Sequence, residues 1–231
     1  MRPADSPFPC HWWGISLEQV GLGDVRPAGG TYGRYEFSAL PPVPFDLRGD
    51  FAWLTAAPVH HEHNIGDQAA AWNAQALKAL REASDRLGLR LPEAFVTFMA
   101  TPALHRRIRS CTDCFLDLGP ALVRAPVGDG SLLRFLADSQ GCLFWYLYLT
   151  RDGADHAVVS SEGFYGGWNG PGGEHWQGEE PDAAALEFCA ESFEEFMCRF
   201  WLENELWFAA WEQTPMPEAG RAYVEQYRRQ Q

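Results

Sequence analysis

The segment His60-His61-Glu62-His63 is the part of the sequence closest to a metal site. In an extended segment His61 and His63 share one face while Glu62 points away, which leaves two ligands where catalytic zinc takes three. The sequence also lacks the His-Glu-x-x-His spacing of a helical zinc site. We therefore expect no metal and no other cofactor. The alternative is a metal-dependent enzyme that uses His60, His61 and His63.

Cysteine and serine nucleophiles receive as little support. Cys111 and Cys114 have the Cys-x-x-Cys spacing of a zinc ribbon, but no second pair completes a tetrahedral site. The chain has no Gly-x-Ser-x-Gly elbow and no cysteine in a recognisable Cys/His protease context. Its six cysteines are scattered, and we expect reduced thiols, mostly in the core. The residues thus predict a protein that is not an enzyme and has no catalytic residues.

A glycine-rich aromatic segment, residues 161–181, is the main candidate for a binding surface. It lacks the Gly-Lys-Ser/Thr of a phosphate loop, so we do not expect nucleotide binding. A long loop that carries aromatic side chains is either a binding loop or a flap packed on a sheet, and both stay open. The predicted partner-binding residues are aromatic or acidic: Tyr165, Trp168, Trp176, Glu179, Glu180 and Asp182.

The acidic excess of the chain lies in its last third. Residues 1–151 carry 14 basic and 15 acidic side chains, whereas residues 152–231 carry 4 basic and 16 acidic ones. A net charge of −13 argues against nucleic acid as the main partner, because nucleic-acid affinity comes largely from basic side chains that displace counterions. The acidic end would attract a basic protein, or it only keeps the protein soluble.

Neither export nor membrane insertion is expected. No stretch approaches the roughly 20 uncharged apolar residues that a membrane-spanning helix requires. The first ten residues contain three prolines and lack the apolar region of a signal peptide. We therefore expect a cytoplasmic protein with neither a membrane nor a nucleic acid as partner.

Helices are expected on both sides of a central β region, and three helix starts stand out. A helix is predicted over residues 68–87, with Asp67 as N-cap and Gly88 just past its end. Its apolar stripe is expected to contain Trp72, Ala76, Leu80 and Leu87. A shorter helix starts at residues 91–92, where proline suits the first turn. Residues 192–195, Ser-Phe-Glu-Glu, form a capping box at the start of another helix.

Between these helices the apolar period changes to two, which predicts successive strands. The strands are expected at residues 115–118, 132–136, 142–150 and 156–160. In the third of these, Trp145 and its i±2 neighbours alternate with Phe144, Tyr146 and Tyr148. A strand that is apolar on both faces lies in the interior of its sheet. The aromatic face carries two hydroxyls, so we expect it to border a groove.

The Leu91-Pro92 start with Phe95 and Phe98 at helical spacing resembles the signature of the SUKH superfamily. That superfamily includes fungal cell-wall-synthesis regulators of the Knr type and many bacterial immunity proteins of contact-dependent and polymorphic toxin systems. The glycine-led aromatic strand at 141–149 and the helix start at 192–196 are similar to it as well. The resemblance runs over residues 91–196, 106 of the 231 positions.

The resemblance implies an α+β fold, a bent antiparallel sheet packed against flanking helices, with no catalytic residues to carry over. Three parts are expected: an irregular or extended N-terminal extension (1–66), a SUKH-like α+β domain (67–212) and a C-terminal accessory segment (213–231). In the extension, residues 35–40 and 51–56 are candidate strands. The implied function is a non-enzymatic protein-binding module, an immunity protein that neutralises a cognate, basic toxin in a bacterium. A regulatory scaffold of the same superfamily is a further alternative.

Overall fold

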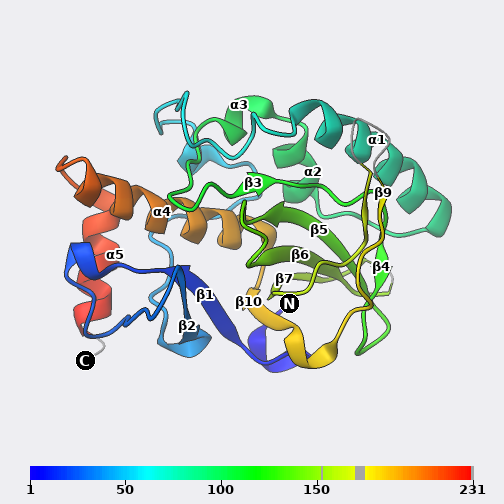
Figure 1. Cartoon of the computed structure of the whole chain (residues 1–231), viewed down its shortest axis with the longest axis horizontal. Coiled ribbons are helices and arrows are strands. Elements are labelled where there is room, and N and C mark those ends of the chain that lie inside the picture. Colours follow the sequence, from blue (N-terminus) through cyan, green and yellow to red (C-terminus); the bar gives the residue numbers. More distant parts are fainter. Residues whose placement is uncertain (152, 170–174, 230–231) are drawn as a thin grey trace.

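The computed structural model (Figure 1) describes residues 1–151, 153–169 and 175–229, and only the backbone of residues 168–169 and 175–176. Its centre is an antiparallel sheet in the order β10-β7-β6-β5-β3, with β4 also paired to β5. The strands are β3 (Phe115–Leu116), β4 (Val123–Arg124), β5 (Ser131–Ala137), β6 (Phe144–Leu149), β7 (His156–Ser161) and β10 (Glu187–Ala190). The predicted α+β class and antiparallel sheet are confirmed.

The described part of the chain forms five α-helices, which pack against the sheet or, in the case of the last one, against another helix. They are α1 (Ala70–Leu87), α2 (Glu93–Met99), α3 (Pro102–His105), α4 (Phe193–Trp211) and α5 (Glu218–Arg229). In Figure 1, α1, α2 and α3 gather above the sheet, while α4 leads away from it toward α5. Among the residues that the structure describes, no helix is long and apolar enough to cross a membrane.

Helix α4 begins as its sequence predicts. The Oγ of Ser192 accepts a hydrogen bond from the amide of Glu195 at 3.2 Å, which satisfies one amide that the first helical turn leaves unpaired. The Glu195 carboxylate reaches back to the amide of Glu191 at 2.9 Å, one residue before the expected one. The capping residue was therefore correctly predicted, and the return bond is shifted by one position.

Helix α1 differs from its prediction at its start and on its buried face. It begins at Ala70, and the carboxylate of Asp67 accepts from Arg106 at 2.9 Å instead of capping the helix. Gly88 ends the helix in the left-handed conformation, as predicted. Leu87 was wrongly placed in the apolar stripe, since it is 72% exposed. The helix buries Asn73, Ala76, Leu77, Leu80 and Ser84.

Strand β6 is buried on both faces, which confirms its predicted interior position. Trp145, Leu147 and Leu149 belong to the larger hydrophobic cluster, together with residues of α1, α2, α3, α4 and α5. Phe144, Tyr146 and Tyr148 belong to a smaller cluster on the other side of the sheet. Alternating side chains of one strand thus enter two cores, because successive residues point to opposite faces.

The first 66 residues contain a hairpin and several short 3-10 helices. Strands β1 (His11–Ile15) and β2 (Tyr32–Glu36) pair antiparallel. The 3-10 helices of this part are η1 (Pro3–Asp5), η2 (Glu18–Val20), η3 (Phe37–Ala39) and η4 (Ala52–Leu54). The strand predicted at 51–56 is wrong, and that at 35–40 is strand only to Glu36. Near η4 the chain wraps around the Glu194 carboxylate, which accepts from the Gly49 and Phe51 amides and so prevents an extended course.

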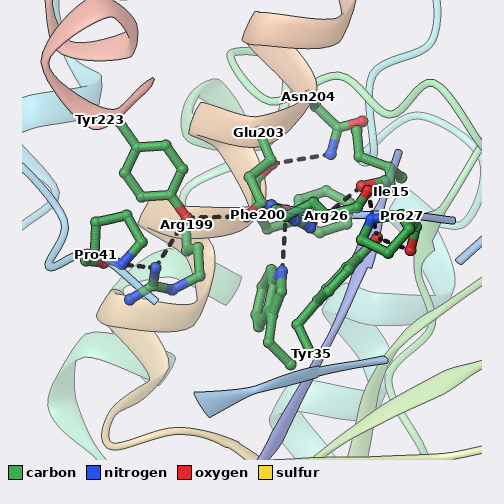
Figure 2. Close-up of polar contacts among 11 residues, drawn as sticks. Ile15, Arg26, Pro27, Tyr35, Pro41, Arg199, Phe200, Glu203, Asn204 and Tyr223 are labelled. Atoms are coloured by element: carbon green, nitrogen blue, oxygen red, sulfur yellow. Dashed lines mark hydrogen bonds and ion pairs between the residues drawn. The ribbon is translucent and has the colours of Figure 1, made fainter. Parts of the chain in front are cut away.

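A buried polar network joins the N-terminal hairpin to α4 and α5 (Figure 2). The Glu203 carboxylate accepts from Trp12 Nε1 at 3.0 Å, from Arg26 at 2.5 Å and from the Tyr223 hydroxyl at 2.9 Å. Arg26 and Glu203 are each 1% exposed. Arg199 donates to the same Tyr223 hydroxyl at 2.9 Å. The network contains residues from all three predicted parts of the chain, which therefore meet in one core. The buried charges of Arg26 and Glu203 pair with each other, and an unpaired buried charge would be costly.

Candidate functional site

A cleft of about 650 Å³ lies between one end of the central sheet and the glycine-rich loop. Its walls come from β3, the end of β5, the start of β6 and the loop residues on both sides of β8 (Trp168–Asn169) and β9 (His175–Trp176). Six lining side chains define its chemistry: Phe115, Asp117, Asp138, Phe144, Phe164 and Glu179. The aromatic face of β6 was expected to border a groove, and this is confirmed at Phe144. Tyr146 and Tyr148 of that face are buried.

Aromatic rings form the apolar part of the cleft. The Phe144 and Phe164 rings meet edge to face with their centroids 5.2 Å apart, a favourable arrangement for an aromatic pair. The guanidinium carbon of Arg134 lies 3.9 Å from the centroid of the Phe164 ring. One face of this phenylalanine therefore already holds a cation.

Asp117 supplies a buried carboxylate to the cleft wall. It is 4% exposed, and its Oδ2 accepts from Arg134 Nε at 2.7 Å. Its Oδ1 is buried and has no hydrogen-bond partner among the residues that the structure describes. Buried polar atoms of native proteins are nearly always paired, so this oxygen is an acceptor that a ligand can satisfy.

Asp138 is the second buried acid of the cleft, and its own turn orients it. It is 3% exposed and accepts from the Gln140 amide at 2.8 Å, an Asx turn that Gly141 closes with a positive φ of 70°. The Tyr32 hydroxyl donates to Asp138 at 2.6 Å. Burial raises the pKa of Tyr32, and its bond to Asp138 raises it further, so the phenol keeps the proton that it donates.

Arg134 fixes the glycine-rich loop to the sheet. It is 2% exposed in the middle of β5 and donates to the carbonyl oxygens of Tyr165 at 2.6 Å and Gly167 at 2.8 Å. The Tyr146 hydroxyl of β6 adds a bond to the Gly163 carbonyl at 2.7 Å and accepts from the Tyr165 amide at 2.9 Å. The first part of the loop is therefore packed on the sheet, which positions Phe164 in the cleft.

The predicted partner-binding residues fall into three groups. Tyr165 is 2% exposed, and its hydroxyl lies 2.9 Å from Ser161 Oγ, so it supports the loop from within the core. Trp168 and Trp176 lie opposite each other in the β8–β9 pair, and their side chains lie outside the described part of the structure. The three acidic members, Glu179, Glu180 and Asp182, are exposed, and Glu179 also lines the cleft.

Two of the histidines in residues 60–63 lie beside different acidic side chains. His60 Nε2 lies 3.4 Å from Glu205, and His63 Nδ1 lies 2.8 Å from Asp113. Within the described ranges, no three His, Cys, Asp or Glu side chains are grouped so that they could hold a metal ion. The structure therefore does not bring the segment's donors together.

The Cys-x-x-Cys pair lies in buried surroundings. Burial raises the pKa of Cys111 to about 12 and that of Cys114 to about 11. At neutral pH both are thiols, and the thiolate is the form that attacks substrates or binds metals. These two residues thus resemble core cysteines in their chemistry.

Three charged residues of the site, Asp117, Asp138 and Arg134, were not selected from the sequence, and neither were Phe115 and Phe164. Each charged residue does carry a signal, since Arg134 interrupts the apolar run of β5 and the two acids adjoin apolar strand segments. A charge at such a position is buried only when it is paired, but the sequence does not show which residue is the partner.

The cleft combines flat aromatic walls with carboxylate oxygens, and this combination is suited to an organic cation. Comparisons of the chain with models of protein families, with curated proteins and with solved structures find no match.

Proposed function

We propose that the chain is a non-enzymatic protein-binding module, an immunity protein of the SUKH type that neutralises a basic toxin. The observation that carries this proposal is the cleft, in which Phe144 and Phe164 stand beside the carboxylates of Asp117, Asp138 and Glu179. Protein interfaces place aromatic anchors at their centre and charged residues at their rim. The cleft has the same arrangement, with Phe144 and Phe164 in its wall and the exposed acids Glu179, Glu180 and Asp182 at its edge or close to it in the sequence.

The charges around the cleft support a basic partner. Glu179, Glu180 and Asp182 are exposed and follow one another closely, and none of them forms a salt bridge with a described residue. Residues 152–231 as a whole carry 4 basic and 16 acidic side chains. Exposed charges of one sign attract an oppositely charged protein over a distance and speed its association.

The sequence resemblance adds the biological class. The helix start at Leu91-Pro92 and the capping box at Ser192 resemble SUKH signatures, and many bacterial members of that superfamily are immunity proteins. Their partners are toxins that the producing cell must neutralise. A cytoplasmic location and a bacterial host belong to the same proposal.

The proposal predicts that a gene adjacent to that of this chain encodes a toxin domain, and the test uses that domain. Co-expression of the chain is expected to restore growth of cells that the toxin arrests, and the two purified proteins should form a stable complex. A toxin that stays active in the presence of a stable excess of the chain would contradict the proposal. So would an absence of binding at both low and physiological salt.

A matched pair of triple variants tests the role of the acids. Neutralising Glu179, Glu180 and Asp182 (E179Q, E180Q, D182N) is expected to slow association roughly tenfold at low salt and to reduce its salt dependence. The asparagine keeps a side-chain oxygen that can accept from the Ala184 amide, as Asp182 Oδ1 does. The control triple E18Q, D24N and E218Q removes the same charge from exposed positions on the α5 side of the molecule. Equal effects of both triples, or none, would refute the assigned surface.

A further inference from the structure

We infer that the cleft binds an arginine side chain of the partner protein, an assignment that rests on the proposed function. The ligand is thus a guanidinium group, held between the aromatic walls and the carboxylates. Three features of the described residues lead to it: an unpaired buried acceptor, a stacking surface and an excess of negative charge.

The unpaired acceptor is Asp117 Oδ1. Arg134 uses only the other oxygen of this carboxylate, at 2.7 Å from its Nε, and turns its remaining donors to the loop carbonyls. Asp117 is 4% exposed and lies in the cleft wall, so a donor that enters the cleft replaces no bond within the protein. A guanidinium has five N–H donors in a fixed plane and satisfies such an oxygen without losing its bonds to other acceptors.

The stacking surface is formed by Phe144 and Phe164. A guanidinium is planar and weakly hydrated, so it stacks on an aromatic ring at little cost in lost hydration. The Arg134 guanidinium carbon, 3.9 Å from the centroid of Phe164, shows the same pairing within this chain. Phe115 extends the apolar wall and can cover the methylene groups of an arginine.

The charge of the cleft favours a cation. Asp117, Asp138 and Glu179 line it, and no Lys or Arg is among the described residues of its wall. Arg134 forms an ion pair with one of the three carboxylates, that of Asp117. A lysine ammonium would be attracted by the same charge, but it is a strongly hydrated point charge that stacks poorly. The cleft is therefore expected to prefer arginine to lysine.

The probe is N-acetyl-arginine methylamide, titrated into the full chain and followed by backbone amide NMR. Saturable shifts are expected at residues 138–144 and 177–179, with the lysine analogue binding at least about fivefold more weakly. E179Q should weaken arginine binding about threefold, because it removes one exposed charge from the cleft. The matched control is E180Q, which removes the same charge from an adjacent exposed residue that does not line the cleft. It should leave the affinity unchanged.

A second variant, F164L, tests the stacking surface. It should reduce arginine affinity about threefold and lessen the preference over lysine, because leucine has no ring face for a guanidinium. A denaturation midpoint close to that of the original chain will show that the sheet is intact. Equal affinities for the arginine and lysine probes overturn the inference. Equal effects of E179Q and E180Q, or shifts confined to other parts of the chain, overturn it too.

The outcomes separate this inference from the proposed function. If the toxin binds in a salt-dependent manner and the arginine probe neither binds the cleft nor competes with the toxin, the arginine assignment fails and the proposed function stands. If the probe binds the cleft as described but the toxin does not bind, the proposed function fails. Competition between the probe and the toxin supports both.

Discussion

Removal of Arg134 is the perturbation that best tests how the cleft is built. In R134M, Asp117 loses its charged partner at 2.7 Å and stays buried, while the carbonyls of Tyr165 and Gly167 lose donors at 2.6 and 2.8 Å. Breaking a buried ion pair from one side costs about 3–5 kcal/mol, mainly because the remaining charge is unpaired. Since domains are stable by about 5–15 kcal/mol, we expect a folded but much weakened protein.

The assay for R134M is urea denaturation combined with hydrogen exchange. Exchange should accelerate most at the Glu179 amide, which donates to the Phe164 carbonyl at 2.7 Å and reports on the loop. The matched control is R124M, which removes an exposed arginine from the neighbouring strand β4 and should change stability by less than about 0.5 kcal/mol.

The double variant R134M/D117N separates the lost charge pair from lost packing. It should be more stable than the sum of the two single changes predicts, because no unpaired carboxylate stays behind. If R134M and R124M had the same unfolding free energy, the anchoring role of Arg134 would be refuted. Strictly additive effects of the R134M and D117N changes would refute the assigned ion pair.

Three further predictions concern the fold. W145A should lower the unfolding free energy by about 3–5 kcal/mol, since Trp145 is 1% exposed on the central strand, and a denaturation midpoint equal to wild type would contradict this. S192A should cost about 1 kcal/mol through the lost α4 cap, and S192D should restore most of it; equal midpoints for all three proteins would argue against the cap. Burial lowers the pKa of His105 and of His156, so the unfolded chain binds more protons below its histidine pKa of about 6.5. The melting temperature should therefore rise with pH between about 5 and 6.5 and level off above, and H105Q should flatten this rise.

Local patterns in the sequence were sufficient to predict several helices and strands around the site. The alternation at Phe144–Leu149 predicted a strand buried on both faces, because successive strand residues point to opposite sides. Ser192 predicted the start of α4, and Gly88 the end of α1, because both signals act within one helical turn. The exposed acids Glu179 and Glu180 were likewise selected from the sequence alone.

Long-range partners decided what local patterns could not. Glu194 binds the Gly49 and Phe51 amides, so residues that read as a strand turn around a carboxylate that lies 143 positions or more away. Tyr165 reads as an exposed loop aromatic but is buried, because Tyr146 and Arg134 hold its backbone. In each case a residue distant in sequence supplies the hydrogen bond, and no local period encodes it.

The composition and order of residues by themselves determined an acidic α+β chain with an aromatic strand and an acidic end. Only the tertiary structure brought Asp117, Asp138 and Glu179 to one cleft with Phe144 and Phe164. The physical reason is that a buried carboxylate needs its partner from elsewhere in the chain. Arg134 of the sheet and Tyr32 of the N-terminal hairpin are these partners in the folded chain, 17 and 106 positions away from the acids that they bind.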